Sequence, residues 1–143
     1  MPTSVRETIA AAIAARLATT PGGPAVRRNP DTMATDANAI DFYEGDQTPI
    51  SWDAAATQYA WTIELELFHA PGANINELYA QTLKHLLDQS WLTTLPGFHD
   101  MREEGLGAAQ IDREAGHDSL NGYLLTLTLE YWTKDGDPYA AGP

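Results

Sequence analysis

Two stretches of the sequence alternate apolar and polar residues with a period of two, and this alternation constrains the fold more than any other feature. The clearer stretch is Tyr59 to Phe68, and the second is Leu120 to Trp132. Because successive side chains on a β-strand point to opposite faces, each stretch predicts a strand with one apolar face and one mixed face. The apolar faces carry Tyr59, Trp61, Ile63, Leu65 and Leu67 on the first strand, and Tyr123, Leu125, Leu127, Leu129 and Tyr131 on the second.

Two other segments have apolar residues at helical spacing. The first runs from Ser4 to Thr19, and Glu7 follows Ser4 by three residues, which is the pattern of a capping box at a helix N-terminus. The second runs from Asn76 to Trp91, with Glu77 in its first turn. Pro-Gly pairs downstream of both segments predict where each helical region ends.

Weaker patterns predict the remaining elements. Ala25 to Asn29 and Ala39 to Tyr43 are expected to be strands, and Gly107 to Glu114 is expected to be a half-exposed edge strand. Pro30 to Asn38 and Thr48 to Thr57 are rich in turn-forming residues and are expected to be irregular.

The predicted order of elements is therefore α-β-β-β-α-β-β. Strands come in neighbouring groups rather than alternating with helices, which favours an α+β fold. We expect a single, mostly antiparallel sheet of four to five strands, with two helices packed on one face. Residues 1–134 form one domain of ordinary size, and residues 135–143, which are polar and rich in Pro and Gly, are expected to be a flexible C-terminal tail.

The chain is strongly acidic. Among its 143 residues, 20 Asp and Glu oppose 8 Lys and Arg, for a formal net charge of −12. Such a surface repels nucleic acid and anionic membranes at long range, so it serves either plain solubility or a channel wall to which DNA must not adhere. There are no cysteines, which excludes disulfides and thiolate metal sites. No stretch reaches the ~20 apolar residues of a membrane span, so no membrane partner is expected.

Motifs for catalysis or cofactor binding are absent from the sequence. Gly105-Leu106-Gly107 lacks the further glycine and the lysine of a phosphate-binding loop. His99 and His117 lie in predicted loops and lack metal-ligand spacing. Glu64 and Glu66 share one face of a strand ~7 Å apart, a spacing that any strand with alternating Glu has. We therefore expect no catalytic residue, no cofactor and no metal.

The second faces of the two strong strands suggest an assembly interface instead. Glu64 and Glu66 share such a face with Phe68, and Trp132 ends the corresponding face of the other strand. Aromatic residues are enriched at protein interfaces, whereas scattered surface aromatics need no explanation. Arg27-Arg28 is the one local positive cluster, and it could meet an acidic patch on a neighbouring copy in a head-to-tail ring.

Three stretches resemble the tail terminator (tail completion) proteins of long-tailed bacteriophages and phage-like particles. They are the opening helix and strand, VRETIAAAIAARLATTPGGPAVRRN; the long strand and helix, YAWTIELELFHAPGANINELYAQTLKHLLDQ; and the closing strand with its tail, LLTLTLEYWTKDGDPY, which ends at Tyr139. The likeness covers nearly the whole chain, but it is one of pattern, and the family has no catalytic signature.

The resemblance implies a structural protein, not an enzyme. Such proteins form a homo-oligomeric ring, commonly a hexamer, on the head-proximal end of the tail tube. Their partners would be the tail tube protein and a head-completion or connector protein, with DNA passing through the ring without specific binding. The protein would be made in the host cytoplasm and end in the neck of the virion or phage-like particle. The candidate interface residues are Arg27, Arg28, Glu64, Glu66, Phe68, Trp132 and Tyr139.

Two alternatives stay open. Another neck protein, such as a head-completion or connector subunit, would have the same general character. A small hydrolase or ligand-binding α+β domain would instead use Glu64, Glu66 or the loop histidines, and it would need a closed apolar pocket lined by convergent polar groups.

Overall fold

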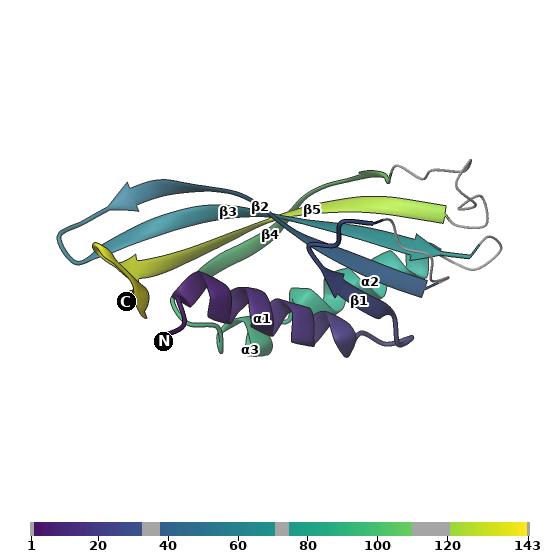
Figure 1. The fold of residues 1–143 in the computed structure, drawn as a ribbon, viewed down its shortest axis with the longest axis horizontal. Coiled ribbons are helices and arrows are strands. Elements are labelled where there is room, and N and C mark those ends of the chain that lie inside the picture. Colours follow the sequence, from purple (N-terminus) through teal and green to yellow (C-terminus); the bar gives the residue numbers. More distant parts are fainter. Residues whose placement is uncertain (1, 33–37, 71–74, 110–120, 143) are drawn as a thin grey trace.

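The computed structural model describes residues 2–32, 38–70, 75–109 and 121–142. Within these residues, three helices lie along one face of a long, twisted sheet of six strands (Figure 1). The elements in chain order are α1 (Val5–Ala18), β1 (Ala25–Arg28), β2 (Asn38–Trp52), β3 (Ala56–His69), α2 (Ile75–Leu86), α3 (Gln89–Leu92), β4 (Phe98–Ala108), β5 (Asn121–Lys134) and β6 (Asp137–Ala141). The α+β class is confirmed, whereas the expected numbers of helices and strands are too low and their order is incomplete.

The strands lie in the order β1-β2-β3-β5-β4, and β6 pairs with β5 beyond the start of β4. Every pairing is antiparallel except that of β1 with β2. The two strands with the strongest alternation, β3 and β5, are neighbours at the centre and pair along their full lengths. The rest of the sheet is built outward from this pair.

The core lies between the sheet and the helices. Trp61 pairs with Leu129, and Leu65 pairs with Leu125, so the apolar faces of β3 and β5 form one continuous surface. From α1, Ile9 and Ile13 are fully buried against the same core. Burial of one such side chain stabilises the fold by roughly 1.5–3 kcal/mol, which makes this layer the main source of stability.

Helix α1 begins where the sequence predicts. The Ser4 hydroxyl accepts a hydrogen bond from the Glu7 N–H at 3.1 Å, which satisfies one of the free donors of the first turn. The Glu7 carboxylate binds Arg28 at the end of β1. The capping position therefore also ties α1 to the edge of the sheet.

The second predicted helix is divided in two. Helix α2 ends at Leu86, and Asp88 begins α3 by accepting hydrogen bonds from the backbone N–H and hydroxyl groups of Ser90 at 3.0 and 2.8 Å. Aspartate is a strong N-cap and competes with helix continuation. Apolar residues at helical spacing continue on both sides of Asp88, so the sequence pattern predicts one uninterrupted helix.

Strand β2 extends through Thr48–Trp52, where the sequence predicts an irregular segment that contains Pro49. Among the described strands, β1 pairs only with Ala39 to Phe42, so the far half of β2 is an edge strand. A proline is tolerated there because its missing N–H costs little on an edge. The turn-forming residues are accommodated by register shifts at Glu44/Gln47 and Pro49/Ser51.

Two further strands differ from expectation. Strand β4 occupies Phe98–Ala108, earlier than the predicted Gly107–Glu114, most of which lies outside the described residues. The expected flexible tail instead contains β6, and the Gly142 N–H donates to the Trp132 carbonyl at 3.0 Å. Gly136, at φ 72°, makes the tight reversal that returns the chain to β5.

We predict that Gly97→Ala is much more destabilising than Gly136→Ala. Both glycines have positive φ, but a Cβ at Gly97 would lie 2.2 Å from the Trp132 carbonyl oxygen, whereas a Cβ at Gly136 would meet nothing within 4 Å. Gly136→Ala should cost about 1–2 kcal/mol from its backbone conformation alone, and Gly97→Ala clearly more. Urea unfolding followed by tryptophan fluorescence measures the difference, and equal losses would contradict the close approach.

Candidate assembly surface

The sheet face opposite the helices, here called the open face, gathers most of the residues that the sequence singled out. Register places side chains from five strands on it, because they alternate with the buried residues of the core face. Its polar and aromatic members are Arg27, Asp41, Tyr43, Gln58, Thr62, Glu64, Glu66, Phe68, Asp100, Arg102, Glu104, Thr126, Thr128, Glu130 and Trp132. Carboxylates outnumber arginines on this face.

An ion pair with a buried carboxylate lies at one end of the open face. The Arg27 guanidinium donates to both carboxylate oxygens of Asp41, at 2.9 and 2.7 Å, and also to the Thr32 carbonyl. The Asp41 side chain has no exposed surface. A carboxylate with this burial needs its bidentate partner, so Arg27 has a structural task within its own chain.

Glu66 stands directly opposite Asp41 in the register, and Glu64 stands opposite Tyr43. Burial raises the pKa of Glu66, and the nearby charges of Asp41 and Glu64 raise that pKa further, while Arg27 opposes them. Burial also raises the pKa of Tyr43. The two glutamates that the sequence singled out are therefore brought into one cluster with Asp41, which the sequence analysis missed.

A second charged cluster lies on β4 and β5. Arg102 donates to Asp100 at 2.9 Å, to Glu104 at 2.8 Å and to Glu130. These hydrogen bonds, that to Glu130 above all, raise the pKa of Arg102 further above its ordinary value. Gln58 on β3 donates to the other oxygen of Glu130 at 2.7 Å. The open face thus carries two arginine-centred clusters with an excess of negative charge.

Trp132 lies beside the second cluster and is half-buried. Its ring meets that of His99 edge-on, with 6.3 Å between the ring centroids. His99, which the sequence places in a loop, lies on β4. The register confirms that Trp132 lies at the end of the mixed face of β5, as the sequence predicts.

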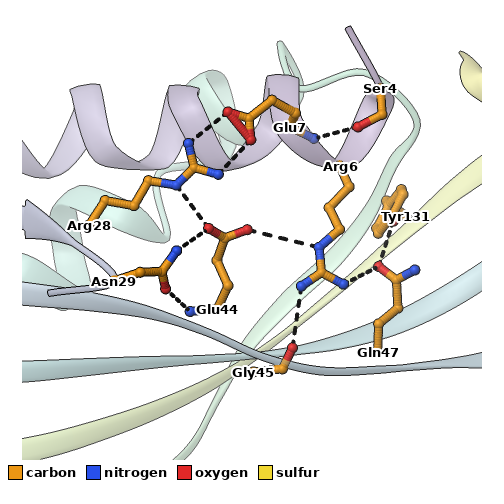
Figure 2. A network of polar contacts seen from close by, with 9 residues as sticks. All are labelled: Ser4, Arg6, Glu7, Arg28, Asn29, Glu44, Gly45, Gln47 and Tyr131. Atoms are coloured by element: carbon orange, nitrogen blue, oxygen red, sulfur yellow. Dashed lines mark hydrogen bonds and ion pairs between the residues drawn. The ribbon is translucent and has the colours of Figure 1, made fainter. Parts of the chain in front are cut away.

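Arg28 points to the helix side and joins a polar network between α1 and β2 (Figure 2). It donates to both oxygens of Glu7, at 2.7 and 2.5 Å, and to Glu44 at 2.9 Å. These bonds raise the pKa of Arg28 and lower that of Glu7. The acidic partners expected on a neighbouring copy are found here in the same chain.

Arg6 extends the same network (Figure 2). Its guanidinium carbon lies 4.5 Å from the centre of the Trp61 ring, and it donates to the Gln47 side-chain oxygen at 3.3 Å. Tyr131 donates to that same oxygen at 2.6 Å. The network therefore joins the start of α1, the irregular middle of β2 and the centre of the core.

Phe68 and Tyr139 differ in their exposure to solvent. Phe68 is fully buried, which conflicts with the expected exposed position. In the sheet, Phe68 lies opposite Ala39 and Gly122. The alternation within β3 alone does not predict which residues of the neighbouring strands lie beside it. Tyr139 lies on β6 and is 55% exposed.

Tyr139 belongs to an exposed apolar end of the sheet that the sequence analysis missed. Ile50 and Trp52, near the end of β2, are 46% and 66% exposed. The hairpin between β2 and β3 adjoins the turn before β6, because the Asp135 N–H donates to the Ala55 carbonyl at 3.0 Å. An isolated Trp in a segment rich in turn-forming residues was the available signal.

Two adjoining grooves lie on the helix side. One, of about 670 Å³, is lined between α1 and α2 by residues that include Arg16, Lys84 and His85, and the other, of about 280 Å³, includes His69. Burial lowers the pKa of His85, and Arg16 adds to this effect. Neither groove is lined by Glu64 or Glu66, so the carboxylates proposed for hydrolysis lie away from both.

No family model matches the sequence, and no curated protein matches it. Within the described residues, no three His, Cys, Asp or Glu side chains are grouped to hold a metal ion. None of the helices in that part of the chain has the length and apolar character needed to cross a membrane.

We predict that Arg27→Met lowers the free energy of unfolding by about 3 kcal/mol, because it leaves the buried Asp41 carboxylate without its partner. The double variant Arg27→Met with Asp41→Asn is the matched control and should recover much of this loss. Urea unfolding at neutral pH measures both variants. Equal instability of the single and double variants would contradict a buried charge as the cause.

We also predict a pH-dependent effect of Glu66→Gln. Because the pKa of Glu66 is raised in the folded chain, the native state keeps this proton where the unfolded state has lost it. The contribution of Glu66 to stability therefore falls as pH rises from the ordinary carboxyl range through the raised pKa. Thermal melts at several pH values should show Glu66→Gln to be more stable than wild type above that window, with the advantage shrinking at acid pH. A difference that is independent of pH would exclude this cause.

Proposed function

We propose that this chain is a tail terminator of a long-tailed phage or phage-like particle. In this role, six copies of the chain form a ring on the head-proximal end of the tail tube. The ring ends polymerisation of the tube and provides the surface that joins the tail to the head-completion protein. The chain has no catalytic task in this proposal.

The open face is the observation that carries this proposal. A sheet with helices on one side leaves its other face to solvent or to partners, and here that face combines clustered carboxylates with Trp132. The pattern of the three resembling stretches points to the same class of protein. Both considerations concern large regions of the chain rather than a local site.

The charge fits passage of DNA through a ring. A channel wall with net negative charge repels the phosphate backbone, so DNA slides without adhering. In this proposal the open face lines the channel, where Asp100, Glu104 and Glu130 exceed the charge of Arg102. The helix layer then faces outward.

The arginines contribute to this arrangement by their internal pairing. Arg27 is held by Asp41, and Arg28 by Glu7 and Glu44, so neither presents a free guanidinium to DNA. Pairing within the chain keeps the positive charge from becoming a nucleic-acid site, which would need a clustered basic surface.

The hydrolase alternative receives less support. Glu64 and Glu66 lie on the open face, whereas the two grooves lie on the helix side. A ligand pocket would need convergent polar groups within an apolar cavity. Another neck protein remains compatible with the same surface, and the assembly test below distinguishes it.

The proposal is tested by adding the purified chain to tail tube protein encoded in the same genome while the tubes polymerise. Negative-stain microscopy should show shorter tubes, each with a ring at one end, because a capped end cannot accept another subunit. Thermally unfolded chain at the same concentration is the control for a nonspecific effect of acidic polypeptide. Tubes of unchanged length without terminal rings would overturn the proposal, and binding to the head-completion protein alone would favour another neck protein.

A further inference from the structure

A hairpin projects from one end of the molecule. It joins β2 to β3 and extends beyond the helix layer (Figure 1). We call residues 50–56 the projecting hairpin. Trp52 lies on it and is 66% exposed, more than any other large apolar side chain of the described residues. Because Trp is enriched among the residues that dominate binding energy, Trp52 is a candidate for burial in a partner.

Hydrogen bonds within the chain fix the shape of the projecting hairpin. One carboxylate oxygen of Asp53 accepts from the N–H groups of Ala55 and Ala56, at 2.7 and 2.8 Å. The Asp53 N–H donates to the Ala56 carbonyl at 3.0 Å. A partner that binds the hairpin therefore does not have to order it. The other oxygen of the exposed Asp53 carboxylate has no hydrogen-bond partner among the described residues, so it is available to a cation.

The larger groove on the helix side lies away from the projecting hairpin. It is lined by the end of α1 and by α2, which Figure 1 places toward the other end of the molecule. We call it the helix groove. Its walls include the apolar side chains of Pro21, Ala80 and Leu87. Its volume of about 670 Å³ is that of a site for a small ligand, so it has room for a large aromatic side chain.

The helix groove also contains a cation that the chain does not pair. Arg16 is bound to Asp88 at 3.2 Å, and Glu77 accepts a hydrogen bond from Gln81 at 3.0 Å. Lys84 is exposed, and within the described part of the chain it forms no ion pair. An unpaired cation beside apolar walls favours an occupant that carries an apolar group next to a carboxylate.

A second copy of this chain supplies such an occupant. Its projecting hairpin presents Trp52 directly beside Asp53. The hairpin and the helix groove are different surfaces at different ends of the molecule, so each copy can offer its hairpin to one neighbour and its groove to another. Head-to-tail contacts of this kind close into a ring when the rotation between copies allows it. They also leave the open face uncovered.

We propose that the projecting hairpin of one copy docks in the helix groove of the next copy. Trp52 packs against Ala80 and Leu87 of the neighbouring copy, and Asp53 pairs with its Lys84. The inference rests on the proposed function, which requires contacts between copies in a ring, and it names the two surfaces that make them.

The test uses single-cysteine variants, because the chain has no cysteine of its own. Ala54→Cys places a thiol on the projecting hairpin, and Ala80→Cys places one in the helix groove. Ala108→Cys, at another exposed alanine, is the matched control on β4. A short bismaleimide should cross-link a mixture of the hairpin and groove variants at least about 10-fold more than a mixture of either with the control. Denaturing electrophoresis measures the yield of cross-linked dimer.

Side-chain changes then test the two contacts within the productive mixture. Trp52→Ser on the hairpin variant and Lys84→Glu on the groove variant should each lower the yield at least about 10-fold. Lys84→Arg keeps the charge, and Leu106→Ser removes an exposed apolar side chain of β4, so each should change the yield less than about twofold. Thermal melts confirm that every variant is folded, and Lys84→Glu, on a separate element, provides the answer if Trp52→Ser is not.

The reactions are run with and without polymerising tail tube protein, which separates this inference from the proposed function. Rings on tube ends without hairpin-to-groove cross-links in either condition keep the function and overturn the inference. Cross-linking of Ala54→Cys with itself above that of the mixture shows that like surfaces meet, and it overturns head-to-tail docking. Hairpin-to-groove cross-links in copies that never cap a tube support the docking and overturn the function. Absence of both rings and cross-links overturns both.

Discussion

The antiparallel pairing of β3 with β5 is the contact on which the rest of the molecule depends. It unites the two strongest apolar faces of the chain, and α1 covers the surface that results. Strands β2 and β4 extend the sheet on either side, and β6 prolongs it at one end. Since both central strands alternate strictly, burial of one face against the helices turns the opposite face outward. The open face is therefore a direct consequence of how the core is built.

Ion pairing within the chain then decides the character of the surface. Arg28 and Arg6 join α1 to β2, and Arg27 neutralises a carboxylate that burial would otherwise make costly. Because these cations serve the fold, the carboxylates left without such partners give the molecule its negative field. Pairing of the arginines within the chain thus stabilises the edge of the sheet and leaves the surface with a net negative charge.

The sequence was a good guide where a residue's role depends on its near neighbours. Ser4 starts α1, and the alternation around Trp61 predicts which side chains are buried, because both follow from local periodicity and capping. It was a poor guide at Asp88, where capping competes with continued helix, and at Pro49, where edge position removes the usual penalty. Of the candidate interface residues, Trp132 could be placed from strand pattern, whereas the burial of Phe68 and the position of Tyr139 on β6 could not.

By itself, the sequence determined the α+β class, the two central strands, the acidic charge and the apolar face of the core. These properties depend on composition and on spacing within one element. Only the tertiary structure decided that Arg27 and Arg28 are paired within the chain, that Glu66 lies opposite Asp41, and that the turn before β6 adjoins the hairpin between β2 and β3. Each of those facts joins segments that are distant in sequence, and their proximity is set by strand order and register, which local pattern does not encode.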